Sequence, residues 1–326
     1  MYKIILFLSV AVIGVCCLVL AVYFYLVPVI DFLADTPIVI DPRPLEYDKI
    51  QHIVCLVYTG RLGNNMFQFA SSYGIARSKG MRLVVPDAFE LLKVFKLNVD
   101  VIKENDHVCR PDNVITRSER KACSFDQRLI NFPSTADIRI ALYLQSYRYF
   151  DKYCDELRKQ FIFKENIINK AKFIFKQALQ KLNITSRNNT TFIGVHVRRG
   201  DFVNNPAGYT VATKEYLQKA VNWYQFKYGK LLYYIVATDG IEWTKENMPN
   251  NLSVFYLEGN APAVDMATLS LCDHFISTEG SFSWWSAWLT GGNVTYYKWP
   301  AKKGSPLRSA YSKNYSDFYY PHWKGL

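Results

Sequence analysis

Two arginines and an aspartate stand at the end of a predicted strand near the middle of the chain. The apolar, β-branched run 190–197 leads directly into Arg198, Arg199 and Asp201. Open α/β sheets bind ligands at the carboxyl ends of such strands, and the alternation of side chains puts His196 and Arg198 on one face. A guanidinium group matches phosphate oxygens two at a time. The pattern therefore predicts a diphosphate-binding site, with a structural Arg–Asp pair at a turn as the alternative.

A glycine-rich turn follows the first predicted strand of the globular part. The apolar run 53–58 leads into the turn 60–64, and a helix over 66–79 and a strand over 81–85 complete a β-α-β unit. Gly80 is a suitable C-cap for that helix. Backbone amides at the start of the helix favour phosphate binding, although a plain tight turn explains the two glycines equally well.

Strands and helices also alternate in the second half of the chain. After an amphipathic helical pattern over 153–182 and a polar stretch over 183–191, the sequence predicts helices at 214–228, 265–272 and 282–289 and strands at 231–237, 254–257 and 274–277. Such alternation is typical of parallel, doubly wound sheets. The predicted fold class is therefore α/β, with two Rossmann-like lobes, residues 51–185 and 186–326, on either side of a cleft.

Two further strands predicted in the second half end in polar residues. Asp239 follows one of them, and the segment 278–281 follows the other. Ser281 is a suitable N-cap for the next helix, whose first amide groups would point into the cleft. The tryptophans within 284–288 are expected to pack in the core, with stacking on a sugar or a base as the alternative.

The first thirty residues predict a membrane anchor. Residues 4–30 contain no charged residue, and about 20 apolar residues are enough to cross a bilayer. A signal peptide has a shorter apolar core of roughly 7–15 residues. Lys3 precedes the span and Asp31 follows it, so the positive-inside rule leaves residues 1–3 in the cytosol. We expect a single-pass type II protein with a stem at 31–50, a cleaved signal peptide being the alternative.

Composition and charge narrow the class of protein and of its partners. Hydrophobic residues make up 50% and aromatic residues 16% of the 326 residues, which argues against disorder. The formal charge of +11 favours an anionic partner. Because the basic residues are spread along the chain rather than clustered, we expect a small phosphorylated ligand or an acidic surface and no nucleic acid.

Sequons and cysteines agree with a location in the lumen of the secretory pathway. Asn-x-Ser/Thr motifs begin at Asn183, Asn188, Asn189, Asn251, Asn293 and Asn314. Five cysteines follow the anchor, which permits at most two disulfides, and none shows Cys-x-x-Cys metal spacing. Cys55 and Cys272 stand in apolar runs and are expected to be buried thiols.

Taken together, the motifs resemble the α-1,2-fucosyltransferase family. The resemblance covers about residues 53–292 and is carried by Gly60-Arg61-Leu62-Gly63-Asn64, His196-Val197-Arg198-Arg199-Gly200-Asp201 and the block 265–292. Protein O-fucosyltransferases and α-1,6-fucosyltransferases are similar more distantly. Membership implies a GT-B-like fold of two facing lobes, a type II Golgi anchor and GDP-fucose as the donor. It also implies inverting transfer to the 2-hydroxyl of a glycan acceptor, typically a β-linked galactose.

The resemblance also implies roles for single residues. Arg198 would hold the donor diphosphate with His196 beside it, and the glycine-rich turn would approach the fucose and the phosphates from the other lobe. Asp265 would face the guanosine, and Ser281 with Phe282 would complete the nucleotide site. The residues expected to bind the donor are Arg61, Leu62, Gly63, Asn64, His196, Arg198, Asp239, Asp265, Ser281 and Phe282.

The chain contains no Asp-x-Asp motif, which many sugar-nucleotide enzymes use to hold a metal ion on the diphosphate. Fixed cations and helix dipoles would then neutralise the leaving GDP, with Arg198 at the centre. We therefore expect an enzyme that needs neither a metal ion nor a cofactor. Asp201 is the candidate base for the acceptor hydroxyl, unless it braces Arg199 instead.

Two departures from the family pattern concern the acceptor. Asn65 stands where many members have glutamine, and Glu279 and the run Ser283-Trp284-Trp285 differ from the vertebrate pattern. One alternative is a fucosyltransferase of another linkage, acting on core glycans or on protein. The other is a catalytically silent, lectin-like membrane protein, which would not need the arginine clamp.

We predict that protease added to intact microsomes leaves nearly the whole chain undigested. The uncharged span 4–30, with Lys3 before it, places the bulk of a type II protein on the luminal side. The measurement is immunoblotting of the protected fragment, with detergent-permeabilised microsomes as the control. Loss of most of the chain without detergent would contradict the topology.

Overall fold

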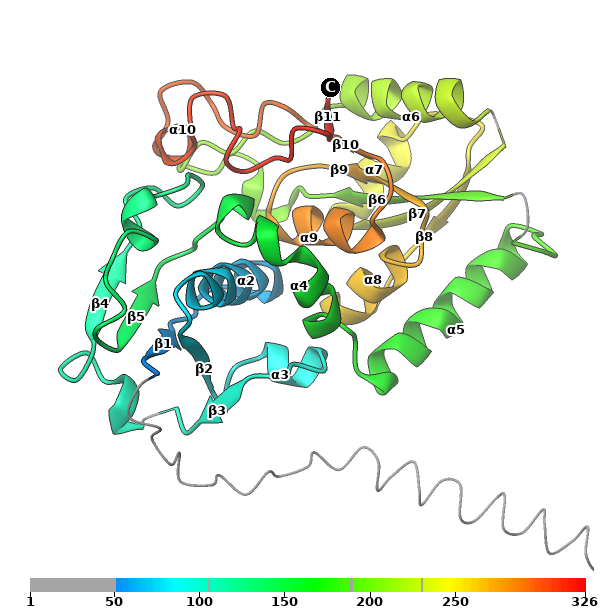
Figure 1. Ribbon diagram of the computed structural model, residues 1–326. Coiled ribbons are helices and arrows are strands. Elements are labelled where there is room, and N and C mark those ends of the chain that lie inside the picture. The colour runs from blue at the N-terminus through cyan, green and yellow to red at the C-terminus, as the bar shows by residue number, and fades with distance from the viewer. Residues whose placement is uncertain (1–50, 105, 188–189, 230) are drawn as a thin grey trace, which may run out of the picture. The chain divides into compact units, whose positions relative to one another are not determined.

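Two sheets of parallel strands organise the part of the chain that the structure describes (Figure 1). The computed structural model describes residues 51–104, 106–187, 190–229 and 231–326. The predicted cytosolic tail, anchor and stem, residues 1–50, lie outside the described residues. Within the described ranges, no helix combines the length and the apolar character that a bilayer crossing requires.

The first sheet has five strands in the order β3-β2-β1-β5-β4, and every pair is parallel. Its strands are β1 (Ile53–Leu56), β2 (Arg82–Pro86), β3 (Asp100–Ile102), β4 (Ile115–Ser118) and β5 (Ile138–Ala141). Along β1, Val54 and Leu56 enter the main core, whereas Ile53 and Cys55 enter a small cluster on the opposite face. The alternation is that of a strand buried on both faces.

The second sheet has six strands in the order β11-β10-β9-β6-β7-β8, again all parallel. Its strands are β6 (Thr191–Val197), β7 (Leu232–Thr238), β8 (Ser253–Tyr256), β9 (His274–Ser277), β10 (Val294–Tyr296) and β11 (Lys324–Gly325). His196 of β6 lies opposite Ala237 of β7 and Ser277 of β9. The residues that follow these three strands therefore meet at one edge of the sheet, as an α/β ligand site requires.

Helices cover both faces of the second sheet (Figure 1). The α-helices are α2 (Leu62–Ser78), α3 (Leu91–Val94), α4 (Cys154–Gln160), α5 (Glu165–Lys181), α6 (Lys214–Tyr228), α7 (Ile241–Asn247), α8 (Pro262–Leu269), α9 (Ser281–Thr290) and α10 (Pro306–Ala310). Short 3-10 turns are η1 (His107–Cys109), η2 (Gln127–Leu129), η3 (Tyr147–Tyr149), η4 (Asp151–Tyr153) and η5 (Gly200–Phe202). Helix α6 packs on Ile193, Val195 and Val197 of β6, whereas Phe192 faces the core that contains α8 and α9.

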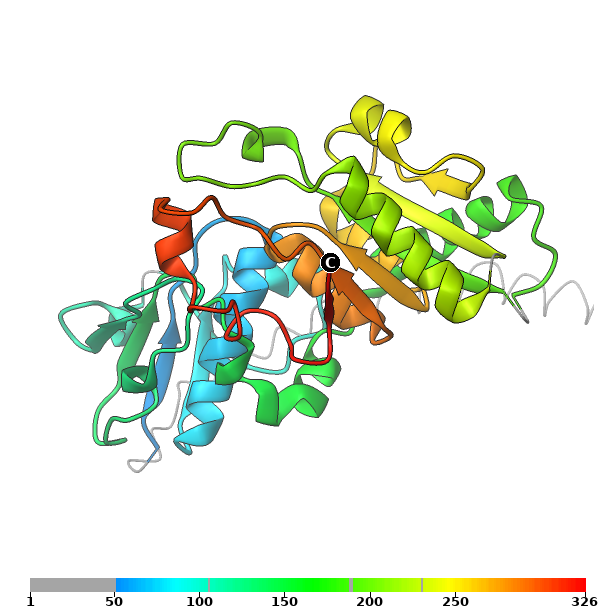
Figure 2. The same ribbon diagram turned by 90° about the horizontal axis from the view of Figure 1, so that it is seen from above.

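Helices α2 and α9 lie side by side and join the two sheets (Figure 1, Figure 2). The fully buried ring of Phe67 lies 4.7 Å from that of Trp284 and 5.1 Å from that of Trp285, between ring centroids. Trp284 also donates a hydrogen bond to the carbonyl of Phe318, at 2.8 Å. The prediction that the tryptophans pack in the core is confirmed. Each large aromatic side chain buried in this way contributes about 1.5–3 kcal/mol.

Gly63 makes the close approach of these helices possible. A Cβ atom at this position would lie 2.5 Å from the backbone nitrogen of Phe282 and 2.6 Å from the carbonyl carbon of Ser281. Both are backbone atoms, so no rotamer change could relieve the overlap. Gly63 is the second residue of α2, and the close packing of the two backbones explains why a glycine occurs there.

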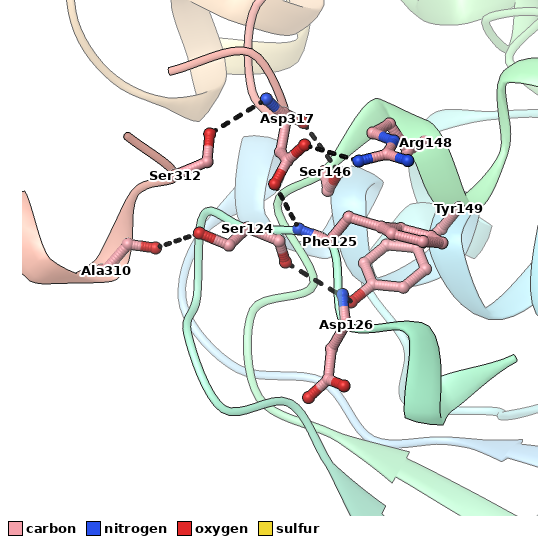
Figure 3. Close-up of polar contacts among 9 residues, drawn as sticks. All are labelled: Ser124, Phe125, Asp126, Ser146, Arg148, Tyr149, Ala310, Ser312 and Asp317. Carbon is pink, nitrogen blue, oxygen red and sulfur yellow. Dashed lines mark hydrogen bonds and ion pairs between the residues drawn. The ribbon is translucent and has the colours of Figure 1, made fainter. Parts of the chain in front are cut away.

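The C-terminal segment around Ala310 and Asp317 makes polar contacts with the loops of the first sheet (Figure 3). The carboxylate of Asp317 accepts a hydrogen bond from the amide of Phe125 at 3.0 Å and pairs with Arg148 at 2.9 Å. Ser146 donates to the carbonyl of Asp317 at 2.7 Å. The hydroxyl of Ser124 donates to the carbonyl of Ala310 at 3.0 Å. The resemblance ended near residue 292 and did not anticipate these contacts.

Three predicted helix starts are wrong. Helix α8 covers Pro262–Leu269 rather than residues 265–272. Helix α2 begins at Leu62 rather than at residue 66, because Asn64 and Asn65 already donate their amides to the carbonyl of Arg61. In α9 the N-cap is Gly280, with φ of 95°, and Ser281 is the first helical residue.

The amphipathic stretch 153–182 is interrupted and forms α4 and α5. Between them Phe163 forms an antiparallel bridge with Phe95, and Lys164 donates its amide to the carbonyl of Val94. This pairing ends the first helix, although the hydrophobic period continues across the break.

Cys55 is not a free buried thiol, as the sequence suggested, but forms a disulfide with Cys109. Cys55 faces the small cluster on the outer side of the first sheet, where Cys109 packs against it. Cys272 is a buried free thiol, as predicted. The pairing could not be read from the sequence, because residue separation does not show which side chains meet.

We predict that Gly63→Ala lowers the free energy of unfolding by about 1–3 kcal/mol, the usual cost of overpacking. The sign is diagnostic, because replacing glycine by alanine within a helix ordinarily stabilises. Chemical denaturation would measure the change, with Ser78→Ala at the exposed end of the same helix as the control. A stabilised Gly63→Ala variant would contradict the described packing of α2 against α9.

Candidate donor and acceptor site

Arg198 lies at the carboxyl end of β6, held between two carboxylates. Its Nη1 lies 2.6 Å from Oδ2 of Asp239, and its Nη2 contacts Oδ1 of Asp201. Its backbone amide donates to Oγ1 of Thr278 at 2.9 Å, which ties the end of β6 to the end of β9. The guanidinium also lies 4.9 Å from the ring centre of Phe202. Asp201 therefore pairs with Arg198 and not with Arg199, which corrects the bracing that we considered from the sequence.

Arg199 has different surroundings. Its guanidinium lies 3.7 Å from the ring centre of Trp243 in α7, and its amide donates to Oδ1 of Asp239 at 2.6 Å. Burial lowers the pKa of Arg199, while Glu279 and Asp239 act in the opposite direction. The carboxylate of Asp239 thus contacts both arginines: it pairs with the guanidinium of Arg198 and accepts a hydrogen bond from the backbone amide of Arg199. The two guanidinium groups are separate, as the strand alternation predicted.

His196 is buried on the face of β6 that leads to Arg198. Its ring lies 4.8 Å from that of Phe282, and its Nδ1 has no hydrogen-bond partner among the described residues. Burial, assisted by the charge of Arg198, lowers the pKa of His196 to about 3. The imidazole is therefore neutral at physiological pH and offers one donor and one acceptor.

The turn after β1 meets the start of α9. The hydroxyl of Ser281 donates to Oδ1 of Asn64 at 2.6 Å, and the side-chain amide of Gln145 donates to the same oxygen at 2.9 Å. Neither α2 nor α9 has an acidic residue in its first turn. Because the first amides of a helix lack partners within it and carry partial positive charge, two helix starts at one place favour an anionic ligand.

Three predicted residues need separate comment. Arg61 is the exposed N-cap residue of α2, where its side chain is accessible to a ligand. Leu62 is buried in the core, so only its backbone is available for binding. Asp265 lies on α8, where it accepts a hydrogen bond from Asn260 at 3.1 Å and where burial raises its pKa to about 6. In the described part of the chain, its contacts do not reach the cluster around Arg198.

The loop after β5 has a strained backbone. Leu142 and Leu144 have φ of 80° and 53°, a region that large L-residues rarely adopt and that costs about 1–3 kcal/mol for each residue. Oε1 of the buried Glu119 accepts the amides of Tyr143 and Leu144, at 2.7 and 2.9 Å. Gln68 donates to the carbonyl of Leu142 at 2.9 Å. These bonds hold the strained conformation.

Residues 40–326 match the family described as glycosyl transferase family 11. The chain belongs to this family. A mouse relative, galactoside alpha-(1,2)-fucosyltransferase 2, is 27% identical over 287 residues, which cover 85% of this chain and 79% of the relative. The relative of the same name from Bos taurus is 26% identical over 301 residues, or 90% and 83% of the two chains. The solved structure of fucosyltransferase NodZ from Bradyrhizobium is 13% identical, covers 72% of this chain and 92% of its own, and has a TM-score of 0.48.

The carboxylates of this glycosyltransferase do not gather into a metal site within the described ranges, where no three His, Cys, Asp or Glu side chains converge. Asp201 and Asp239 both form ion pairs with Arg198. Glu279 is 1% exposed, and burial raises its pKa well above the usual value, although Arg199 acts against the shift. Glu279 is therefore a buried carboxyl whose ionised form is disfavoured, and it is not an open metal ligand.

Sequence reasoning missed several residues of the site in this glycosyltransferase. Thr278 was within a recognised polar segment, and the parallel register of β9 against β6 puts it beside Arg198. Gln145 and Glu119 come from a region without a clear pattern. Only the pairing of β5 between β1 and β4 brings them to the site.

The sequons differ in their surroundings. Asn183, Asn251 and Asn314 are exposed. Asn293 is half-buried, and its side chain contacts Tyr228 and accepts a hydrogen bond from Lys227. Asn188 and Asn189 lie outside the described residues.

We predict that Glu119→Gln makes the stability of the protein less dependent on pH. Burial raises the pKa of Glu119 from 4.5 to about 8, against the lowering effect of the two backbone amides. The folded state binds this proton more tightly than the unfolded chain, so the stabilisation is complete below about pH 4.5 and is lost as the pH rises through about 8. Glutamine keeps the accepting oxygen and cannot ionise. Denaturant unfolding between about pH 5 and pH 8 would measure the difference.

The matched control for this measurement is Glu246→Gln, at an exposed position on α7. Parallel pH curves for wild type and Glu119→Gln would contradict the prediction.

Proposed function

We propose that this family 11 enzyme transfers L-fucose from GDP-fucose to the 2-hydroxyl of a galactoside, with inversion at the anomeric carbon. The relatives named above act as galactoside α-1,2-fucosyltransferases by name, and they align over most of their length. The observation that carries the proposal is Arg198, held at a strand end beside the starts of two helices. In this reading the two sheets are the lobes of a GT-B-like enzyme, and residues 186–326 bind the donor.

Arg198 would bind the diphosphate and stabilise the charge that develops on GDP as the bond between fucose and phosphate breaks. To offer two donors to phosphate oxygens, the guanidinium must release a carboxylate. Asp239 is anchored twice, by Arg198 and by the amide of Arg199, and its side chain is 30% exposed. The side chain of Asp201 is 56% exposed and pairs with Arg198 alone among the cations of the described chain. We therefore expect the diphosphate to displace Asp201, and not Asp239, from Arg198.

A displaced Asp201 would be free to take the proton of the acceptor hydroxyl. The acceptor oxygen then attacks the anomeric carbon, the new glycosidic bond forms as the bond to the phosphate breaks, and GDP leaves. Binding of the donor thus prepares the base, because one cation cannot hold the diphosphate and both carboxylates at once. A single displacement of this kind inverts the configuration.

The remaining predicted residues would complete the donor site. The neutral His196 can hydrogen-bond the donor without adding charge, and the amides at the starts of α2 and α9 would meet the phosphates together with Arg61. Asp265 would accept hydrogen bonds from the guanine base, a task for which its neighbour Asn260 holds it in place. Ser281 and Phe282 line the junction between these groups.

We further propose a type II membrane glycoprotein of the Golgi with its catalytic part in the lumen. The uncharged span 4–30 and the exposed sequons Asn183, Asn251 and Asn314 support this location. The engaged side chain of Asn293 makes it the least suitable of the described sequons.

The test of the function uses detergent-solubilised full-length protein and labelled GDP-fucose. Acceptors are phenyl β-D-galactoside, the matching N-acetylglucosaminide and fucoside, and a serine/threonine peptide. We expect transfer to the galactoside, and NMR of the product should show an α-linkage to O2. Transfer to another acceptor alone would overturn the proposed substrate, and donor binding without turnover would favour the lectin-like alternative.

We predict that Arg198→Lys lowers kcat/KM for fucose transfer by roughly 10²–10³, the typical effect of removing one donor at a developing charge. Lysine keeps the charge but cannot hold two oxygens in a plane. Arg199→Lys is the matched control and should lose much less, because a lysine at that position can still lie over Trp243. Equal activity of Arg198→Lys and wild type would remove Arg198 from the site.

We also predict that transfer survives EDTA. Arg198 and the two helix starts supply positive charge at the proposed diphosphate position, and the nearest carboxylates are paired with that arginine. The assay compares metal-stripped protein with and without added Mn²⁺. Loss of turnover that Mn²⁺ restores would show that a metal ion does the work assigned to Arg198.

A further inference from the structure

We propose that the loop 142–145, with Tyr143 at its centre, binds the acceptor galactoside. The inference rests on the proposed function and assigns the acceptor subsite within it.

The first argument is the backbone of the loop. Leu142 and Leu144 on either side of Tyr143 both have positive φ, where glycine would be unstrained. Strained conformations persist where the surroundings enforce them, and they gather at binding and catalytic sites. Here Glu119 and Gln68 enforce the conformation through three hydrogen bonds. Leu144 is part of the core, whereas the half-exposed Leu142 has no packing role among the described residues that would require a leucine at its positive φ.

The second argument is what the loop exposes. Leu142 is 46% and Tyr143 38% exposed, whereas Leu144 is fully buried and anchors the loop. An aromatic ring on a rigid backbone loses little conformational entropy when a ligand packs on it. Galactose has an apolar face of C–H groups on one side of its ring, which suits an aromatic side chain, and its hydroxyls suit the amide and carbonyl groups of such a loop.

The third argument is the location. The loop follows β5, which pairs with β1, so it shares a sheet edge with the turn 60–64. Gln145 at its end donates to Asn64, which also accepts from Ser281. A galactoside on this loop would therefore lie next to the helix starts at which the donor is proposed to bind.

Tyr209 belongs to an aromatic pair next to Arg198. Its ring stacks on that of Phe202, with 3.8 Å between ring centres, and Phe202 in turn lies under Arg198. Burial raises the pKa of Tyr209 to about 12, with smaller contributions from Cys123, Tyr143 and Asp201. The aromatic pair Phe202 and Tyr209 therefore flanks the paired side chains of Arg198 and Asp201.

The C-terminal segment supports the loop from behind. The amide of Gln145 donates to the carbonyl of Ala122, and Ser146 donates to the carbonyl of Asp317 (Figure 3). The carboxylate of Asp317 pairs with Arg148, just after the loop. Together with the hydrogen bond from Gln68 to the carbonyl of Leu142 at the start of the loop, these contacts hold both ends and fix the backbone of Tyr143 before an acceptor binds.

The experiment measures fucose transfer by full-length protein carrying Tyr143→Ala, with phenyl β-D-galactoside as the acceptor. We expect the acceptor KM to rise at least about tenfold, the effect of losing one buried aromatic contact. The KM for GDP-fucose should shift less than about twofold. Tyr143→Phe keeps the ring and should stay within about threefold of wild type in acceptor KM. Phe226→Ala, which removes a 93% exposed ring from α6, is the matched control.

The outcomes separate this inference from the proposed function. An active wild type whose acceptor KM is unchanged by Tyr143→Ala would overturn the inference and leave the function intact. A rise in donor KM equal to that of the acceptor would also overturn it. If wild type uses only a different acceptor from the panel, both the proposed substrate and the assignment of the loop to a galactoside are overturned. A wild type without any transfer would overturn both.

Discussion

The site depends on the contact between α2 and α9. Phe67, Trp284 and Trp285 bury their rings against one another, and Gly63 lets the two backbones touch. This contact places the first turns of both helices together, so that Ser281 donates a hydrogen bond to Asn64 although the two helices follow strands of different sheets. The packing of these rings thus positions the polar residues, because Trp284, Trp285 and Ser281 all belong to the rigid helix α9.

Charge neutralisation is the second constraint. The chain concentrates Arg198, Arg199, Asp201 and Asp239 at one sheet edge, and each cation there has an anionic partner or an aromatic ring. His196 lies close by and is held neutral by burial, and burial also raises the pKa of Glu279. In the proposed function, a diphosphate bound by Arg198 would have to exchange with a carboxylate that already pairs with this arginine. Binding of the donor would thus release the carboxylate that acts as the base, because a guanidinium can pair with only two such groups at a time.

The loops of the first sheet are held by residues far away in the sequence. Ser146 and Asp317 are separated by 171 positions, and Phe125 and Asp317 by 192. The C-terminal segment is thus part of the architecture of the proposed acceptor side, although no motif marks it. The strain at Leu142 and Leu144 is tolerated because Glu119 and Gln68 satisfy the polar groups of the loop. Rigid support of this kind fixes a binding surface before a ligand arrives.

The sequence by itself determined the parallel α/β class, the buried strand before Arg198, helix α6 with its bounds and the core position of the tryptophans. These features depend on short-range periodicity and on residue type, which a single chain displays directly. The family followed from the same motifs, because residues 196–201 place two arginines and an aspartate directly at the end of a buried strand. The tertiary structure decided that Asp201 and Asp239 share Arg198, that Cys55 meets Cys109, that α2 starts at Leu62, and that Glu119 and Gln145 reach the site. Each of these depends on which distant segments pack together, and packing between segments is decided by the shape and burial of the whole core rather than by any local pattern.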